Sequence, residues 1–299
     1  TAGPDRPGHP LTGIPNMSRR IDHLVVAVRD LDQAAAFYKR LGFQVGARNR
    51  HPWGTENRIV QFRSSFVELI TVGEGAEIAP HAERRFSFGA FVRDYLKSRE
   101  GLAMLVLDSQ DAAFARAGIG AFEPFRFERK GSRPDGSEVH VAFSLAFAAM
   151  PEASRAGFFV CQQHYPENFW NPAFQTHDNR AEDIIAVALS IPDPDRHKAF
   201  LSAFTGEVPS RPSLHDLSYR LAGGGHLDVM TPDDAGETYG SVEAEMDQPS
   251  FVAFAVRVDD VSRQAKWLDA AGIPFAHIGT RLVVPASAGM GVAIAFEAT

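Results

Sequence analysis

The first part of the chain changes from a continuous apolar run to a helical spacing of apolar positions. The run is rich in β-branched side chains, which favours a buried strand. Asp30 stands where a helix N-cap is expected, the apolar positions that follow fall on one helical face, and Gly42 is placed to end that helix. The predicted elements are a strand at 21–28, a helix at 31–41 and short strands at 43–45, 58–62 and 66–70.

This order of one strand, one helix and further strands recurs along the chain. Opening strands are predicted at 102–107, 184–189 and 251–256, and helices at 109–118, 194–204 and 261–271. Further strands are predicted at 122–129, 138–147, 157–163, 226–230 and 292–296. Glycines end the later helices at Gly118, Gly206 and Gly272. A pattern seen four times predicts an α+β fold of four tandem βαβββ modules in two paired halves.

The composition of the segments between these elements predicts the domain organisation. Residues 1–16 are rich in Pro and Gly, so residues 1–18 are expected to be a disordered leader or tag remnant ahead of a start near Met17. The first half is expected over 19–164, a linker over 165–183 and a second, degenerate half over 184–299. The linker contains Phe169, Trp170 and Phe174, so it is either a packed strap or part of a pocket wall.

The overall charge and composition limit the kinds of binding partner that the protein is expected to have. A net charge of −7 argues against nucleic acid, which requires a basic face. No apolar run is long enough to span a bilayer. The single cysteine, Cys161, allows no intramolecular disulfide and lies in an apolar run that is typical of a core. A cytoplasmic protein, monomeric or homodimeric, with a small-molecule partner is therefore expected.

Several segments resemble a known family. The run IDHLVVAVRDLDQAAAFYKRLGFQV, with FVELI after it, resembles the opening module of the vicinal-oxygen-chelate superfamily. More narrowly, HPWGTENRIVQF and HYPENFWNPAF resemble a glyoxalase-like-domain group of bacterial proteins. The resemblance is good from about residue 19 to 177 and weak beyond. It implies open, curved sheets around a cleft, where active members hold a divalent metal that chelates two neighbouring substrate oxygens.

The resemblance also implies where metal ligands would stand. His23 occupies the histidine position of the first strand and Glu68 the carboxylate position of the last strand of the first module. Imidazole and carboxylate suit Zn, Ni, Mn or Fe(II). In the second module Leu102 occupies the histidine position and cannot bind metal. Cys161 occupies the second carboxylate position, although a slip in register would offer Gln162, Gln163 or His164 instead.

The expected metal ligands are therefore His23, Glu68 and His164, with His140 as a further candidate on a neighbouring strand. No metal is expected in the second half, since the corresponding positions hold Ala186, Asp228, Phe251 and Ala295.

Polar and aromatic residues near the first module predict a small-molecule site. The expected substrate-binding residues are His51, Trp53, Asn57, Gln61, Gln163 and Trp170. Trp53 can equally be a plug beneath a turn, and Asn57 can satisfy loop backbone. The run Glu128-Arg129-Lys130 is typical of a solvated surface.

Two functions are consistent with these features. The first is a metal-dependent lyase, isomerase or dioxygenase acting on an oxygenated metabolite, with His23 and Glu68 as catalytic residues. The second is a metal-free protein that binds or sequesters a small molecule, as in the bleomycin-resistance type, with the aromatic residues holding the ligand. The weak second half can also serve only as a scaffold that covers a sheet edge.

Overall fold

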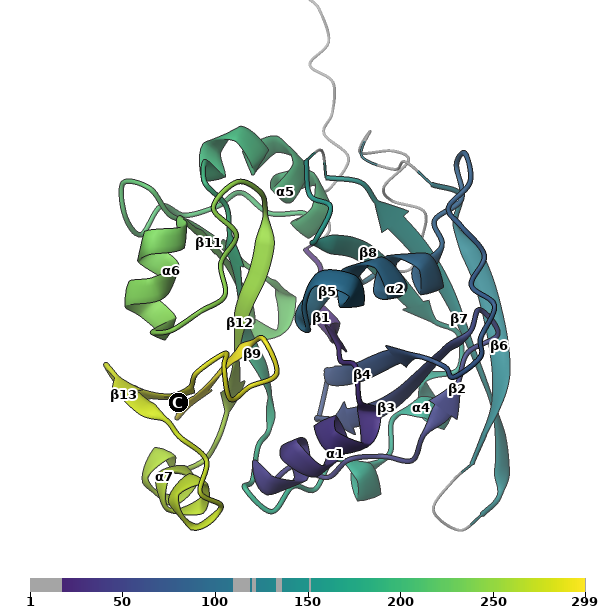
Figure 1. Cartoon of the computed structure of the whole chain (residues 1–299), viewed down its shortest axis with the longest axis horizontal. Helices are drawn as coiled ribbons and strands as arrows, with labels where there is room; N and C mark the ends of the chain where they lie inside the picture. Colours follow the sequence, from purple (N-terminus) through teal and green to yellow (C-terminus); the bar gives the residue numbers. More distant parts are fainter. Residues whose placement is uncertain (1–17, 110–118, 120–121, 133–135, 151, 299) are drawn as a thin grey trace, which may run out of the picture.

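The computed structural model describes residues 18–109, 119, 122–132, 136–150 and 152–298, and it contains two open, curled sheets side by side (Figure 1). The first sheet has the strand order β2-β3-β4-β1-β5-β8-β7-β6, and the second β10-β11-β9-β12-β15-β14-β13. The strands of the first sheet are β1 (Ile21–Ala27), β2 (Asn49–Arg50), β3 (Thr55–Gln61), β4 (Phe66–Val72), β5 (Gly101–Asp108), β6 (Phe125–Ser132), β7 (Glu138–Ala148) and β8 (Gly157–Gln163). Those of the second are β9 (Asp183–Ser190), β10 (Leu217–Arg220), β11 (His226–Met230), β12 (Ser250–Arg257), β13 (Ala276–Ile278), β14 (Arg281–Val284) and β15 (Ala293–Glu297).

Short helices connect the strands. The α-helices are α1 (Leu31–Arg40), α2 (Phe88–Ser98), α4 (Pro166–Phe169), α5 (Lys198–Thr205), α6 (Pro232–Tyr239) and α7 (Val261–Ala270). Three 3₁₀ turns are η1 (Pro172–Phe174), η2 (Pro194–His197) and η3 (Ala222–Gly224). Within the described residues, none of these helices has the length and apolarity that crossing a membrane requires.

The pairing of strands confirms the predicted modular fold. β1 runs parallel to β4 and antiparallel to β5, which in turn runs parallel to β8. The second sheet repeats the arrangement, because β9 runs parallel to β11 and antiparallel to β12, which runs parallel to β15. Each sheet therefore joins two modules through their opening strands, and the α+β class with open sheets is as expected from the sequence.

Several strand positions differ from the sequence-based prediction. No strand forms at 43–45, because the Phe43 N–H bonds to the end of α1 and the Gln44 N–H bonds to His177. The short strand β2 forms a few residues later instead. The strand predicted at 122–129 is β6, whose residues begin and end three positions later. The predicted helix at 109–118, with Gly118, lies almost entirely outside the described residues.

Helix α2 was not predicted, and it covers part of the concave face of the first sheet. Ser87 caps it by accepting a hydrogen bond from the Ala90 N–H. Phe88, Val92 and Tyr95 are spaced for one helical face and pack against β1, β4 and β8. The loop before this helix has no apolar periodicity, so the sequence pattern did not indicate where the helix begins.

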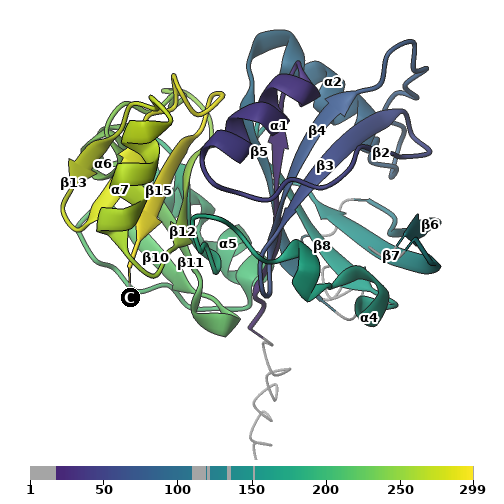
Figure 2. The same cartoon turned by 90° about the horizontal axis from the view of Figure 1, so that it is seen from below.

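The two halves share one hydrophobic core. Phe158 of β8 packs edge-on against Phe200 and Phe204 of α5 and lies 5.2 Å from the ring of Phe251 in β12. On the other side Phe43 stacks on Phe296. Helices α1, α5 and α7 contribute side chains to this core, and the view from below shows α1 and α5 between the two sheets (Figure 2). Burial of aromatic rings across this boundary couples the stability of one half to the other.

The opposite face of the second sheet is lined mostly by small side chains. Alanines line it on three neighbouring strands, and the buried Tyr239 of α6 lies in the same cluster. Of the second-half positions that correspond to the family's metal ligands, Asp228 accepts a hydrogen bond from the Ser218 hydroxyl, and Phe251 points into the shared core. These small side chains let α6 pack close to the second sheet, whereas the concave face of the first sheet has a cavity.

Residues 165–183 are both a strap and part of a pocket wall. The Gln61 amide donates to the Phe169 carbonyl and accepts from the Asn171 N–H, which ties the segment to β3. Further along, Asn179 packs on Gly42, where φ is +95° and a β-carbon would lie 2.6 Å from the Asn179 Cβ. Only glycine fits this crossing without strain.

His177 of the strap gives a testable pH dependence. Its Nδ1 accepts from the Gln44 N–H and its Nε2–H donates to the Gln61 carbonyl, so the ring is neutral. Burial lowers the pKa of His177 to about 4. The unfolded chain binds the proton near pH 6.5, so stability is full above that pH and decreases as pH falls towards 4. We expect His177 to remove about 3 kcal/mol of unfolding free energy over this window. Urea unfolding of wild type and His177→Gln at pH 7 and pH 4.5 measures it, and equal pH dependence in both proteins would contradict it.

Candidate functional site

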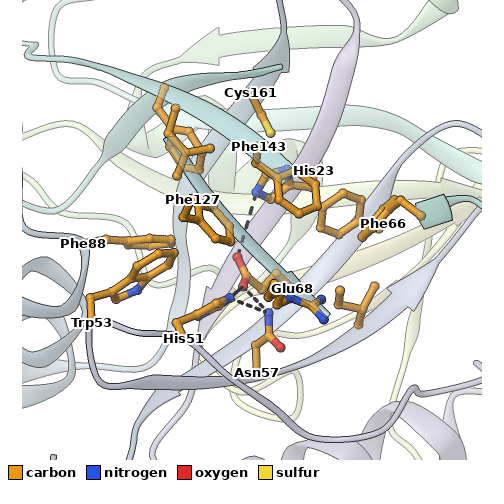
Figure 3. Close-up of a pocket in the computed structure, with 15 residues that line it drawn as sticks. His23, His51, Trp53, Asn57, Phe66, Glu68, Phe88, Phe127, Phe143 and Cys161 are labelled. Carbon is orange, nitrogen blue, oxygen red and sulfur yellow. Dashed lines mark hydrogen bonds and ion pairs between the residues drawn. The ribbon is translucent and has the colours of Figure 1, made fainter. Parts of the chain in front are cut away.

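The concave face of the first sheet holds a cavity (Figure 3). Strand alternation turns His23 of β1 and Glu68 of β4 towards this cavity, while their neighbours Leu24 and Leu69 point into the shared core. Both polar side chains are about 6% exposed. Two buried polar groups on adjacent parallel strands therefore face the same enclosed space.

The His23 ring is fixed on two sides. Its Nδ1 lies 2.6 Å from a carboxylate oxygen of Asp22, and the ring stacks on Phe66 with centroids 4.3 Å apart. A neutral ring that donates Nδ1–H to Asp22 presents the Nε2 lone pair to the cavity. This Nε2 lies 3.9 Å from Glu68 Oε2. Gln163 completes the arrangement by donating its amide hydrogen to the other Asp22 oxygen at 2.8 Å.

Glu68 is held by a second chain of hydrogen bonds. The Asn57 amide donates to Glu68 Oε1 at 2.5 Å, and His51 Nε2 lies 3.7 Å from the same oxygen (Figure 3). His51 Nδ1 lies 2.8 Å from the Thr55 hydroxyl. Burial is the main cause that lowers the pKa of His51, which keeps this ring neutral near pH 7. The second carboxylate oxygen, Oε2, is left facing His23.

Aromatic side chains form most of the cavity wall. Trp53 stacks on His51 at 4.5 Å and packs against Phe88 and Phe127. Its indole Nε1–H is buried without a hydrogen-bond partner among the described residues. The other aromatic lining residues are Phe66, Phe143, Phe159 and Phe169. Trp53 therefore has both features expected from the sequence, because its ring packs against other aromatic side chains and also lines the cavity.

A second, larger cavity adjoins the first. Ile59, Arg129 and Phe169 line both. Gln61 and Asn168 line only the second. The two cavities therefore share part of their walls, and Arg129 lies at the boundary between them.

Only some of the residues that the sequence predicted to bind substrate line the first cavity. His51, Trp53 and Asn57 line the first cavity together with His23 and Glu68. Gln61 lines the second cavity, but its amide is used to hold the strap. Gln163 contacts Asp22, and Trp170 packs edge-on against Phe66 and Phe169 without lining either cavity.

The structure places the expected third metal ligand away from the cavity. His164 Nε2 lies 2.7 Å from the Ser144 hydroxyl, and the residue lines neither cavity, because strand alternation turns it away from Cys161 and Gln163. Leu102 is buried in the shared core. His140 lies 3.3 Å from Glu128 on the outer surface. Cys161 does line the cavity, but burial raises the pKa of its thiol well above the ordinary value, which favours the uncharged form.

Two residues of the site were not identified from the sequence. Asp22 precedes His23, but a β-bulge lets both side chains meet, and bulges leave no pattern in the sequence. Arg129 follows Phe125 and Phe127 at two-residue spacing, which indicates a shared strand face. That spacing could have shown from the sequence that Arg129 faces the same way as the two phenylalanines, unlike its charged neighbours.

The donor set bears on the expected metal. His23 Nε2 and Glu68 Oε2 are suitable donors, and Asp22 fixes the orientation of the imidazole through its Nδ1. However, among the described residues no group of three or more His, Cys, Asp or Glu side chains is placed to hold a metal ion. Transition metals are usually held by at least three protein ligands. These residues do not fit such a centre.

We therefore expect this protein to retain much less than one equivalent of divalent metal per chain. Two donors without a third give weak binding that dialysis reverses. Elemental analysis after reconstitution with Zn²⁺, Ni²⁺, Mn²⁺ or Fe²⁺ and dialysis measures this, with Glu68→Ala as the comparison. About one metal per wild-type chain that is lost in Glu68→Ala would show that the site gains a further ligand on binding.

Comparison with known proteins places the fold. Among solved structures, a hypothetical protein from Staphylococcus aureus matches with a TM-score of 0.65 and 12% identity, covering 93% of this chain and 99% of that one. A mutant of 4-hydroxymandelate synthase from Streptomyces coelicolor matches with a TM-score of 0.52 and 15% identity, covering 86% of this chain and 76% of that one. A xylose isomerase-like TIM barrel/4-hydroxyphenylpyruvate dioxygenase fusion protein matches with a TM-score of 0.54 and 17% identity, covering 91% of this chain but 42% of its own.

Sequence comparison assigns the family. A search of curated proteins gives no match. The family described as "Glyoxalase-like domain" matches residues 21–205, which contain the whole first sheet and every side chain of the cavity. The low identities of the solved structures establish the fold alone. On the family match and the paired βαβββ modules together, the chain belongs to the glyoxalase-like domain family of the vicinal-oxygen-chelate superfamily.

Proposed function

We propose that the chain is an enzyme that moves a proton on a small carbonyl compound bound in the first-half cavity, as an isomerase or lyase. The single observation that carries this proposal is the arrangement Asp22–His23···Glu68. An imidazole held by one carboxylate at 2.6 Å presents its free nitrogen to a second carboxylate 3.9 Å away. Oriented imidazoles are the most frequent general bases in enzymes.

His23 is the proton acceptor in this proposal. Its Nε2 lone pair takes a proton from a carbon next to a carbonyl, and the electron pair of that C–H bond moves into the carbonyl to give an enolate. The positive charge that develops on the ring is stabilised by Asp22 at Nδ1 and by Glu68 across the cavity. Return of the proton to a neighbouring atom completes an isomerisation, and loss of a leaving group completes an elimination.

The other lining residues support this role. Trp53 lines the cavity, and its Nε1–H is a buried donor without a partner among the described residues. The phenylalanines exclude water, which strengthens charge interactions at the reacting atoms. Asn57 and His51 fix the Glu68 carboxylate, so little reorganisation is needed as charge develops.

Exchange of hydrogen for deuterium tests the proposal without knowledge of the final product. Carbonyl compounds with aromatic or branched aliphatic bodies are incubated with the protein in D₂O, and ¹H NMR follows loss of the signal from the carbon next to the carbonyl. We expect at least one compound to exchange faster than in a protein-free control. Compounds that bind in the cavity without any exchange would contradict the enzyme and favour a metal-free binding protein.

A further inference from the structure

Arg129 is a cation that faces the inside of the cleft. On β6 it shares its face with Phe125 and Phe127, while Glu128 and Lys130 point outward to ion pairs with His140 and Glu138. Its side chain lines both cavities at their boundary. The interpretation of this charged run as solvated surface therefore holds for the two flanking residues and is wrong for Arg129.

Among the described residues, Arg129 has no ion pair. Its one hydrogen bond, to the Lys130 carbonyl, is long at 3.4 Å. Every other wall residue of the first cavity except His23, His51, Asn57 and Glu68 is apolar or weakly polar. Glu68 attracts Arg129 electrostatically, but the two side chains do not form an ion pair. A guanidinium with five donors beside an apolar cavity is poorly compensated when no anion is bound.

We infer that Arg129 binds a carboxylate group of the ligand, whose apolar body occupies the phenylalanine-lined cavity. A guanidinium presents two parallel donors that match the two oxygens of a carboxylate. The nearby Glu68 carboxylate disfavours a ligand group with two negative charges, so a singly charged carboxylate fits better than a phosphate. This inference rests on the proposed function only in placing the ligand's reacting carbon near His23.

A matched pair of ligands tests the inference by binding alone. Phenylpyruvate and phenylacetone share an aromatic ring and a ketone, and differ in a carboxylate against a methyl group. Calorimetric titration of wild type is expected to give a dissociation constant about 10- to 100-fold lower for phenylpyruvate, as a charged hydrogen-bonded pair warrants. Arg129→Gln is expected to remove this preference, and Arg129→Lys to keep part of it.

Arg126 supplies the control. It lies on the same strand but points outward, 3.7 Å from Glu128. Arg126→Gln removes the same charge from β6 and is expected to leave the preference unchanged. Equal binding of both ligands to wild type, no binding of either, or an unchanged preference in Arg129→Gln would overturn the inference. Deuterium exchange reports separately on the proposed function, because a ligand can be held by Arg129 without being turned over.

Discussion

Replacing His23 with alanine is expected to lower the rate of deuterium exchange at the bound ligand by about 10²- to 10⁴-fold. The variant removes the imidazole whose Nδ1 is held by Asp22 and whose Nε2 faces Glu68 across the cavity. The cavity wall formed by Trp53 and the phenylalanines stays in place, so ligand affinity should change little. The measurement is the exchange rate at saturating ligand, by NMR, together with the dissociation constant.

Asp22 distinguishes orientation from simple packing in the same experiment. It does not line the cavity but holds the His23 ring. Asp22→Asn keeps the shape and removes the charge, so we expect a lower exchange rate at saturation with an unchanged dissociation constant. An exchange rate in His23→Ala equal to that of wild type would show that His23 is not the base.

Replacing Phe158 with alanine is expected to lower the free energy of unfolding by about 3–5 kcal/mol. Its ring is 1% exposed and packs on Phe200, Phe204 and Phe251, all of which belong to the second half. The cavity left behind would therefore weaken both halves at once. Leu214, which is 77% exposed, gives a control, since Leu214→Ala should change stability by less than about 0.5 kcal/mol.

Hydrogen exchange shows whether that loss is shared between the halves. In Phe158→Ala the amides of β4 and of β11 should lose protection by similar factors, because one core spans both sheets. Loss of protection in the first sheet alone would mean that the halves unfold independently.

The strongly periodic parts of the fold could be predicted from the sequence. The β-branched run of β1 and the Asp30-capped helix α1 were placed to within a residue or two. Local signals agree there with the final packing. The strand predicted at 43–45 does not form, because the Gln44 N–H bonds to His177, more than 130 residues away in the chain. Such a contact leaves no local pattern in the sequence.

The candidate site was only partly predictable for the same reason. His23, Glu68, His51 and Asn57 lie on or near three adjacent strands, β1, β4 and β3, so strand patterns bring them together. His164 could not be excluded from the sequence, since one residue of register decides whether it or Gln163 faces inward. Arg129 was missed because a charge between two other charges suggests exposure, whereas only its partners on the strand face reveal its direction.

The most direct test of this account is deuterium exchange by chelator-treated wild-type protein, compared with His23→Ala and with wild type supplied with divalent metal. The account predicts exchange by the metal-free wild type, no gain on adding metal, and loss of exchange in His23→Ala. Exchange that appears only when metal is added would contradict it, because the chemistry would then depend on a metal held by His23 and Glu68 rather than on the imidazole acting as base.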